Sequence, residues 1–150
     1  KLIREAMAAG AFGFSTGLIY PPCSYAPTDE LIALNREVAA YDGIFVVHQR
    51  DEGYYLARSF DEVCAVSRRS GARLHVSHLQ AYGRQNWPIM DKVLTQADRF
   101  IDDGGRVTWD RYPYLAGATV LHRAADSARF SEDLDFFHDV ALLLNAYDPC

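Results

Sequence analysis

The chain has 150 residues, of which 49% are hydrophobic and 23% are charged, a composition typical of a globular domain with an apolar core. The formal net charge of −5 argues against nucleic acid or an anionic membrane as a partner, because both attract basic surfaces. No apolar run approaches the roughly 20 residues that a membrane-spanning helix requires.

The cysteines and the first residues indicate where the protein works. Cys23, Cys64 and Cys150 show no metal-ligand spacing, and so odd and sparse a set predicts a reducing compartment. We therefore expect a cytoplasmic protein, with Cys64 as a small hydrophobic residue of the core. The sequence begins at Lys1 inside a helical pattern and shows no signal peptide, which predicts a segment of a longer protein.

Helical and strand patterns alternate through most of the chain. In chain order we expect a helix over 1–9 ending at Gly10, a strand over 11–16, a helix starting at Thr28, a strand over 43–48, a helix from Ser59 to Gly71, a strand over 73–78, a helix over 87–103 and a strand over 106–110. Ser59 and Glu62 form a capping-box pattern. Thr28 and Asn86 are expected to cap the helices that follow them.

The spacing of the expected strands indicates a repeated βα unit. Their centres fall near positions 14, 46, 76 and 108, which are steps of about 30 residues. An open doubly wound sheet and a (β/α)8 barrel both fit this spacing, which does not choose between them. After Tyr114 the pattern fades into a candidate helix over 134–145, and His122 and His138 are expected at the surface.

Two histidines end two apolar runs, 43–48 and 72–78. At the carboxyl ends of neighbouring parallel strands, His48 and His78 would lie side by side where α/β barrels place metals and substrates. Because neutral imidazole is the commonest nitrogen ligand of zinc, the pair is predicted to bind one metal ion. The alternative is that each is a structural polar residue at a strand end. His75 is expected on the opposite strand face, packing or contacting a helix.

Other residues near these strand ends have polar groups suited to a substrate. Arg50 could hold a carboxylate bidentately, although residues 50–52 could equally be a solvated charge run. Tyr112 and Tyr114 flank a proline after the last strand, where they either orient a carbonyl or carboxylate or pack within a loop. The absence of GxGxxG and GxxxxGK[ST] motifs argues against a phosphate cradle.

Five motifs occurring together resemble a known family. They are FGFSTGLIYPP (12–22), VHQRDE (47–52), VSHL (76–79), NW (86–87) and DRYPYLAG (110–117). This combination resembles the N-acyl-D-amino-acid deacylases, the D-aminoacylases of the amidohydrolase superfamily. The resemblance implies that residues 1–121 are the central part of a (β/α)8 TIM-type barrel, roughly its strands four to seven. Residues 122–150 are then an unassigned, divergent tail or the start of an insertion.

The resemblance also implies a metal-dependent reaction. His48 and His78 match the zinc ligands of the fifth and sixth strands. The implied reaction is hydrolysis of the amide bond of an N-acyl-D-amino acid to a carboxylate and a D-amino acid. The general-base aspartate of the family is expected outside this chain, so no catalytic residue is assigned and the isolated segment is expected to be inactive.

Four residues match positions that the family uses for substrate. Tyr20 and Tyr112 match tyrosines of the substrate pocket, and Arg50 matches a polar position beside the first histidine, from which it could face the substrate carboxylate. Gln80 stands where the family typically has a lysine that helps to bind this carboxylate, which leaves the substrate preference open.

Two alternatives remain at this point. One is another enzyme of the superfamily, similar to a dihydroorotase or a hydantoinase. Such enzymes commonly use a carboxylated lysine, and Lys1 and Lys92 are not placed for that role. The other is a non-catalytic α/β fragment with structural histidines. The sequence predicts no oligomeric state.

Overall fold

The computed structural model describes residues 1–114, which contain four helices, four strands and two short 3-10 helices. In chain order these are α1 (Leu2–Ala8), β1 (Gly13–Gly17), η1 (Cys23–Tyr25), α2 (Thr28–Ala39), β2 (Ile44–His48), α3 (Leu56–Ser70), β3 (Arg73–Val76), η2 (Arg84–Asn86), α4 (Ile89–Asp102) and β4 (Val107–Trp109). The chain divides into two compact units, Lys1–Arg111 and Tyr112–Cys150. The predictions for residues 122–150 lie outside the described residues.

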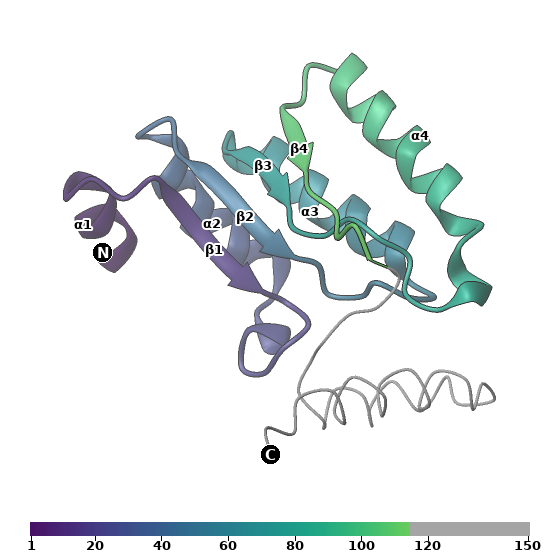
Figure 1. Cartoon of the computed structure of the whole chain (residues 1–150). Coiled ribbons are helices and arrows are strands. Elements are labelled where there is room, and N and C mark those ends of the chain that lie inside the picture. Colours follow the sequence, from purple (N-terminus) through teal and green to yellow (C-terminus); the bar gives the residue numbers. More distant parts are fainter. Residues whose placement is uncertain (115–150) are drawn as a thin grey trace. The chain divides into compact units, whose positions relative to one another are not determined.

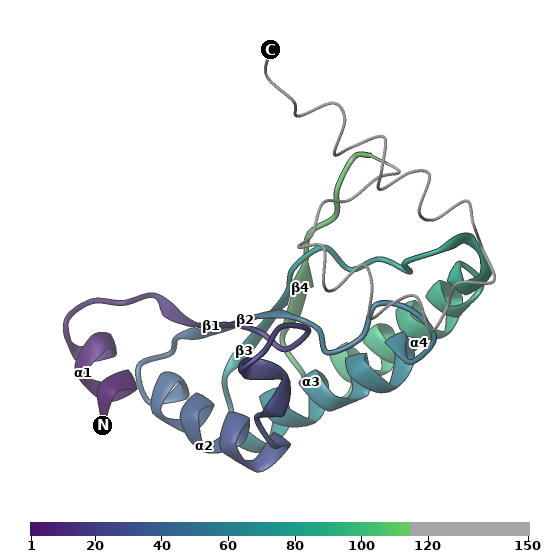
Figure 2. The same cartoon turned by 90° about the horizontal axis from the view of Figure 1, so that it is seen from below.

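The strands form one parallel sheet in the order β1-β2-β3-β4 (Figure 1). Helices α2, α3 and α4 all lie on the same face of this sheet (Figure 2). Right-handed crossovers between strands added in one direction place every connecting helix on one face, whereas a doubly wound sheet reverses its strand order and has helices on both. The α/β class and the parallel sheet are confirmed. No helix within residues 1–114 is long and apolar enough to cross a membrane.

The core lies between the sheet and the helices. Strand register aligns Phe14, Phe45, Leu74 and Val107 across the covered face. Phe45 and Leu74 are completely or almost completely buried and belong to one cluster with Phe60 of α3. This burial of apolar surface fixes the strand register, because a shift of one residue would turn the apolar side chains to the other face.

Helix α3 starts earlier than the sequence predicts. It begins at Leu56, so Ser59 lies inside the helix and the predicted capping box with Glu62 is wrong. The Ser59 hydroxyl instead accepts a hydrogen bond from the backbone N–H of Asp51 (3.1 Å), and Glu62 pairs with Arg50. Both polar groups are used by the loop that follows β2, a tertiary contact that local sequence does not reveal.

Thr28 and Asn86 also bond to partners other than the predicted ones. The Thr28 hydroxyl donates to Glu62 (2.9 Å) rather than capping α2, and Pro27 takes the N-cap position. The Asn86 side-chain amide donates to the carbonyl of Tyr82 (2.7 Å), and α4 begins only at Ile89. Side chains able to cap helices are here used to hold loops.

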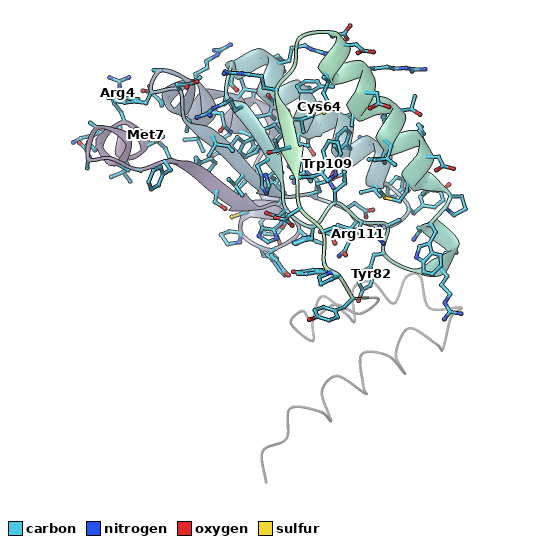
Figure 3. The ribbon with its side chains drawn as sticks, turned by 45° about the horizontal axis from the view of Figure 1, so that its top comes forward. Arg4, Met7, Cys64, Tyr82, Trp109 and Arg111 are labelled. Carbon is cyan, nitrogen blue, oxygen red and sulfur yellow. The ribbon has the colours of Figure 1, made fainter. Side chains whose placement is uncertain are left out.

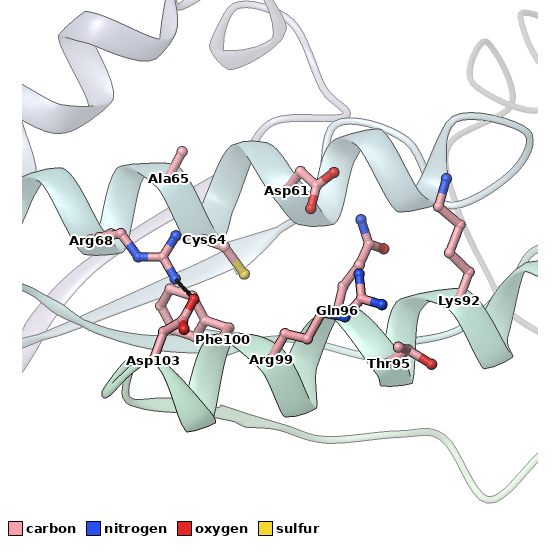
Figure 4. Close-up of a pocket in the computed structure, with 10 residues that line it drawn as sticks. All are labelled: Asp61, Cys64, Ala65, Arg68, Lys92, Thr95, Gln96, Arg99, Phe100 and Asp103. Carbon is pink, nitrogen blue, oxygen red and sulfur yellow. Dashed lines mark hydrogen bonds and ion pairs between the residues drawn. The ribbon is translucent and has the colours of Figure 1, made fainter.

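A shallow groove separates α3 from α4 on the helical layer (Figure 4). Arg68 donates to Asp103 (3.2 Å), and its guanidinium lies 5.0 Å from the centre of the Phe100 ring. Cys64 is buried beside them, as predicted, and this burial raises the pKa of its thiol to about 12. The thiol is therefore protonated and unreactive at neutral pH.

Candidate metal site at the carboxyl ends of the strands

The structure brings His48 and His78 together. His48 is the last residue of β2, and His78 follows β3 by two residues. The Nδ1 atom of His48 lies 2.5 Å from the Nε2 atom of His78, and the ring centres are 4.5 Å apart. Both rings are half-buried, so the two nitrogens meet at one point that is partly shielded from solvent.

The backbone at His78 explains this convergence. Its φ of +40° lies in the left-handed region, which a residue with a side chain rarely adopts. The backbone N–H of His78 donates to the carboxylate of Asp110 (2.6 Å), which holds the turn. Strand β3 consequently ends at Val76, whereas the sequence predicted that it would extend to residue 78. This turn brings the His78 ring to His48.

His75 lies on the open face of the sheet. It pairs in register with Val46, two residues before His48, so His75 and His48 are on the same sheet face. Its Nδ1 atom is 2.8 Å from the Thr108 hydroxyl, and its Nε2 atom is 3.0 Å from Asp110. The predicted helix contact is wrong, because the alternation used to place His75 relative to His78 fails where β3 ends.

Asp110 is a site residue that the sequence reasoning missed. One carboxylate oxygen accepts from the backbone of His78 and the other contacts His75. The His78 N–H and the His75 ring together hold the pKa of Asp110 below its usual value, so the carboxylate is ionised at neutral pH. Its position directly after the fourth strand was the available signal.

Glu52 is a second missed residue. Only 9% of it is exposed, although the sequence suggested a solvated charge run. One carboxylate oxygen lies 2.9 Å from Nδ1 of His78, and the other accepts from the side-chain amide of Gln80 (3.3 Å). The Gln80 amide is thus directed to Glu52, and its predicted contact with substrate stays untested.

The surroundings of the two rings shift their pKa values in opposite directions. Burial, followed by the neighbouring His78, lowers the pKa of His48. The hydrogen bond with Glu52 raises the pKa of His78. His48 is accordingly neutral at pH 7 and has a lone pair available on Nδ1 if its proton is on Nε2.

The donor set fits a zinc ion. Zinc binds imidazole nitrogens, and two of them converge here. Within residues 1–114, no group of three or more histidine, cysteine, aspartate or glutamate side chains is arranged to hold a metal. The described part of the chain therefore supplies two imidazole donors.

Arg50 is engaged within the protein. Its guanidinium makes two hydrogen bonds to the Glu62 carboxylate (2.9 and 3.0 Å) and also donates to the carbonyls of Ser24 (2.5 Å) and Ala26 (3.0 Å). These bonds tie the loop around η1 to α3. The guanidinium is therefore occupied by groups of the protein itself. The predicted clamp on a substrate carboxylate stays untested.

Tyr20 lies beside the end of β1. A Cβ atom on Gly17 would be 3.0 Å from the Tyr20 ring, so the ring occupies the space that a side chain at position 17 would need. Gly17 pairs in register with His48, which places Tyr20 near the carboxyl end of β2. Tyr112 begins the second compact unit, and its predicted role stays untested.

The loops after β3 and β4 lie at the same end of the first unit. Figure 3 shows Tyr82 and Arg111 there, with Arg4 and Met7 of α1 at the opposite end. The backbone N–H of Tyr82 donates to the carbonyl of Glu52 (2.6 Å), which joins the loop after β3 to the loop after β2. Such strand ends are where α/β barrels gather their functional residues.

Comparisons with known proteins agree with this geometry. No protein-family model matches the chain. The D-aminoacylase of Alcaligenes xylosoxydans xylosoxydans is 35% identical over 127 residues, which cover 80% of this chain and 25% of that protein. The N-acyl-D-glutamate deacylase of the same organism is 38% identical over 121 residues, covering 81% and 25% respectively.

A solved structure matches as well. It is the N-acyl-D-glutamate deacylase from Bordetella bronchiseptica, complexed with zinc and a phosphonate inhibitor that mimics the tetrahedral intermediate. The match has a TM-score of 0.78 and 36% sequence identity, and covers 82% of this chain and 26% of that chain. The chain is a homologue of the N-acyl-D-amino-acid deacylases.

This deacylase homologue spans about a quarter of the length of the curated relatives it matches. The match in both sequence and structure confirms the resemblance that the five motifs predicted. It does not favour the alternative of a dihydroorotase-like or hydantoinase-like enzyme.

Proposed function

We propose that the chain is part of a zinc-dependent amidohydrolase that acts on N-acyl-D-amino acids. In the reaction the acyl C–N bond breaks, the hydroxyl of water joins the acyl carbon, and a proton joins the amine. The products are a carboxylate and a free D-amino acid. The observation that carries the proposal is the convergence of the His48 and His78 nitrogens in a homologue of the deacylases.

We also propose that β1 to β4 are consecutive strands of a (β/α)8 barrel, roughly the fourth to the seventh. The unbroken strand order and the helices on one face support this placement. The open sheet face would then line the barrel interior. Half-buried Ile44 and Val46 on this face suit such a position.

His48 and His78 would hold the zinc ion through Nδ1 and Nε2 respectively. The chemistry that zinc supplies to amide hydrolysis is Lewis acidity toward the carbonyl oxygen and a lower pKa of bound water. The residues of this chain bind and orient. Asp110 holds the backbone of His78, and the Tyr20 ring stands at the neighbouring strand end.

Asp110 is not the group that transfers protons in this proposal. Both of its oxygens are engaged, with His75 and with the His78 backbone. A general-base aspartate is proposed outside the chain, so the 150-residue segment alone should not hydrolyse N-acyl-D-amino acids. Zinc-dependent turnover by this segment would contradict that proposal. A cytoplasmic location is likewise proposed, and cell fractionation tests it.

The central experiment compares histidine variants of the full polypeptide that carries this chain. We expect His48→Ala and His78→Ala each to lose bound zinc, measured by elemental analysis, and hydrolysis of N-acetyl-D-glutamate. Gln85→Ala is the control, because Gln85 is exposed and is not part of the site. Unchanged zinc content and turnover in both site variants would overturn the proposed function.

A further inference from the structure

Glu52 stands out as a buried carboxylate with a defined set of contacts. Its side chain is only 10% exposed. Taking a carboxylate out of water is unfavourable unless charged or polar partners surround it. The two oxygens of Glu52 meet different groups, the Nδ1 atom of His78 at 2.9 Å and the side-chain amide of Gln80 at 3.3 Å.

The contact with His78 decides which ring nitrogen bears a proton. A carboxylate accepts hydrogen bonds, so the nitrogen facing Glu52 must be the protonated one. In the neutral ring this leaves the lone pair on Nε2, the atom that faces His48 at 2.5 Å. A metal-binding histidine commonly donates its second N–H to a carboxylate in this way, which fixes ring orientation and strengthens the ligand.

We propose that Glu52 is a positioning residue that sets the tautomer and orientation of His78 for metal binding, with Gln80 holding the second oxygen of Glu52. This inference rests on the proposed function, because it assumes that His48 and His78 hold zinc. Glu52 acts through His78 and does not itself contact the metal. The Asp110 contact fixes the backbone of His78, and Glu52 fixes the ring.

The test compares Glu52→Leu with Glu52→Gln in the full polypeptide. Leucine removes the acceptor, and we expect zinc affinity, measured by competition with a chromophoric chelator, to fall about 10- to 100-fold. Glutamine keeps a carbonyl acceptor and should restore most of the affinity. In nitrogen-15 spectra of the zinc-loaded protein, His78 should be the Nδ1–H tautomer in the wild type and in Glu52→Gln.

Glu62→Leu is the matched control. Glu62 is also a largely buried carboxylate (18% exposed side chain), but it pairs with Arg50 instead of a histidine. This variant should lose stability and keep wild-type zinc affinity. Equal zinc affinity in Glu52→Leu and wild type would overturn the inference, as would failure of Glu52→Gln to exceed Glu52→Leu. A wild-type protein that binds no zinc would instead overturn the proposed function.

Discussion

Two clusters of side chains that include residues after β2 each contain one largely buried carboxylate, and they differ in the partner of that carboxylate. In the Glu62 cluster (Glu62, Arg50 and Thr28), the carboxylate accepts from a guanidinium and a hydroxyl. Burial alone would raise the pKa of Glu62, but the bonds and charge of Arg50 and the Thr28 hydroxyl hold it below its usual value. The cluster is closed in the sense that the charge of Arg50 neutralises that of Glu62, and the hydrogen bonds of Arg50 hold the η1 loop.

The Glu52 cluster (Glu52, His78 and His48) is open at one end. Its carboxylate contacts one imidazole, and that imidazole faces a second one across 2.5 Å. Two ring nitrogens that face each other in this way can share a proton, and in the proposed function they would hold one zinc ion. The difference teaches that a largely buried carboxylate fixes the fold when its partner is a permanent cation, and orients an imidazole ring, here the one proposed to bind zinc, when its partner is a histidine.

The strongest way to sharpen this contrast is to break the closed cluster. Arg50→Met leaves the Glu62 carboxylate without its cation, and we expect about 3 kcal/mol of lost stability with zinc affinity unchanged. Thermal and urea unfolding of the full polypeptide measure the loss. Arg69→Met is the control, because the Arg69–Asp29 pair is exposed and should contribute less than about 1 kcal/mol. A large fall in zinc affinity in Arg50→Met would remove the distinction between the clusters.

Gln49 lies between His48 of one cluster and Arg50 of the other. Its replacement should raise the stability of the protein instead of lowering it. Its side chain is fully buried, and neither amide atom has a hydrogen-bond partner within residues 1–114. Because an unsatisfied buried amide is unfavourable, Gln49→Leu should stabilise the protein by about 1–2 kcal/mol. Gln85→Leu, at an exposed position, should have almost no effect. Destabilisation by Gln49→Leu would mean that the amide is bonded.

The smallest expected effect distinguishes two roles for Gln80. If its amide serves Glu52, Gln80→Ala should weaken zinc binding only about two- to fivefold, the worth of one modest hydrogen bond. If it serves the substrate carboxylate, as the sequence predicted, KM should rise and zinc affinity should stay constant. Zinc competition and steady-state kinetics on the same preparations separate these outcomes.

The strands and the histidine pair were predictable because their signals are local. Apolar runs around Phe45 and Leu74 mark two buried strands, and the spacing of His48 and His78 places both at strand ends. The observed sheet has β2 at Ile44–His48, within one residue of the predicted span. Parallel pairing brings the ends of β2 and β3 together, as the sequence argument required, and the left-handed turn at His78 then brings its ring to His48.

The supporting residues were not predictable, because their roles depend on tertiary contacts. Glu52 resembles an ordinary surface charge until the loop after β3 covers it, and Glu62 resembles a helix cap until Arg50 is placed. The His75 prediction failed for a related reason. Strand alternation was extended through His78, where a left-handed residue ends the strand.

That left-handed residue has a consequence for engineering. A position with φ near +40° is most comfortable for glycine or asparagine, and a bulkier side chain there is unfavourable by about 1–2 kcal/mol. A search for thermostable variants that scored folding alone would replace His78 and discard the imidazole. Under the proposed function, stability and zinc binding thus oppose each other at this position, and libraries screened for heat resistance should hold it constant.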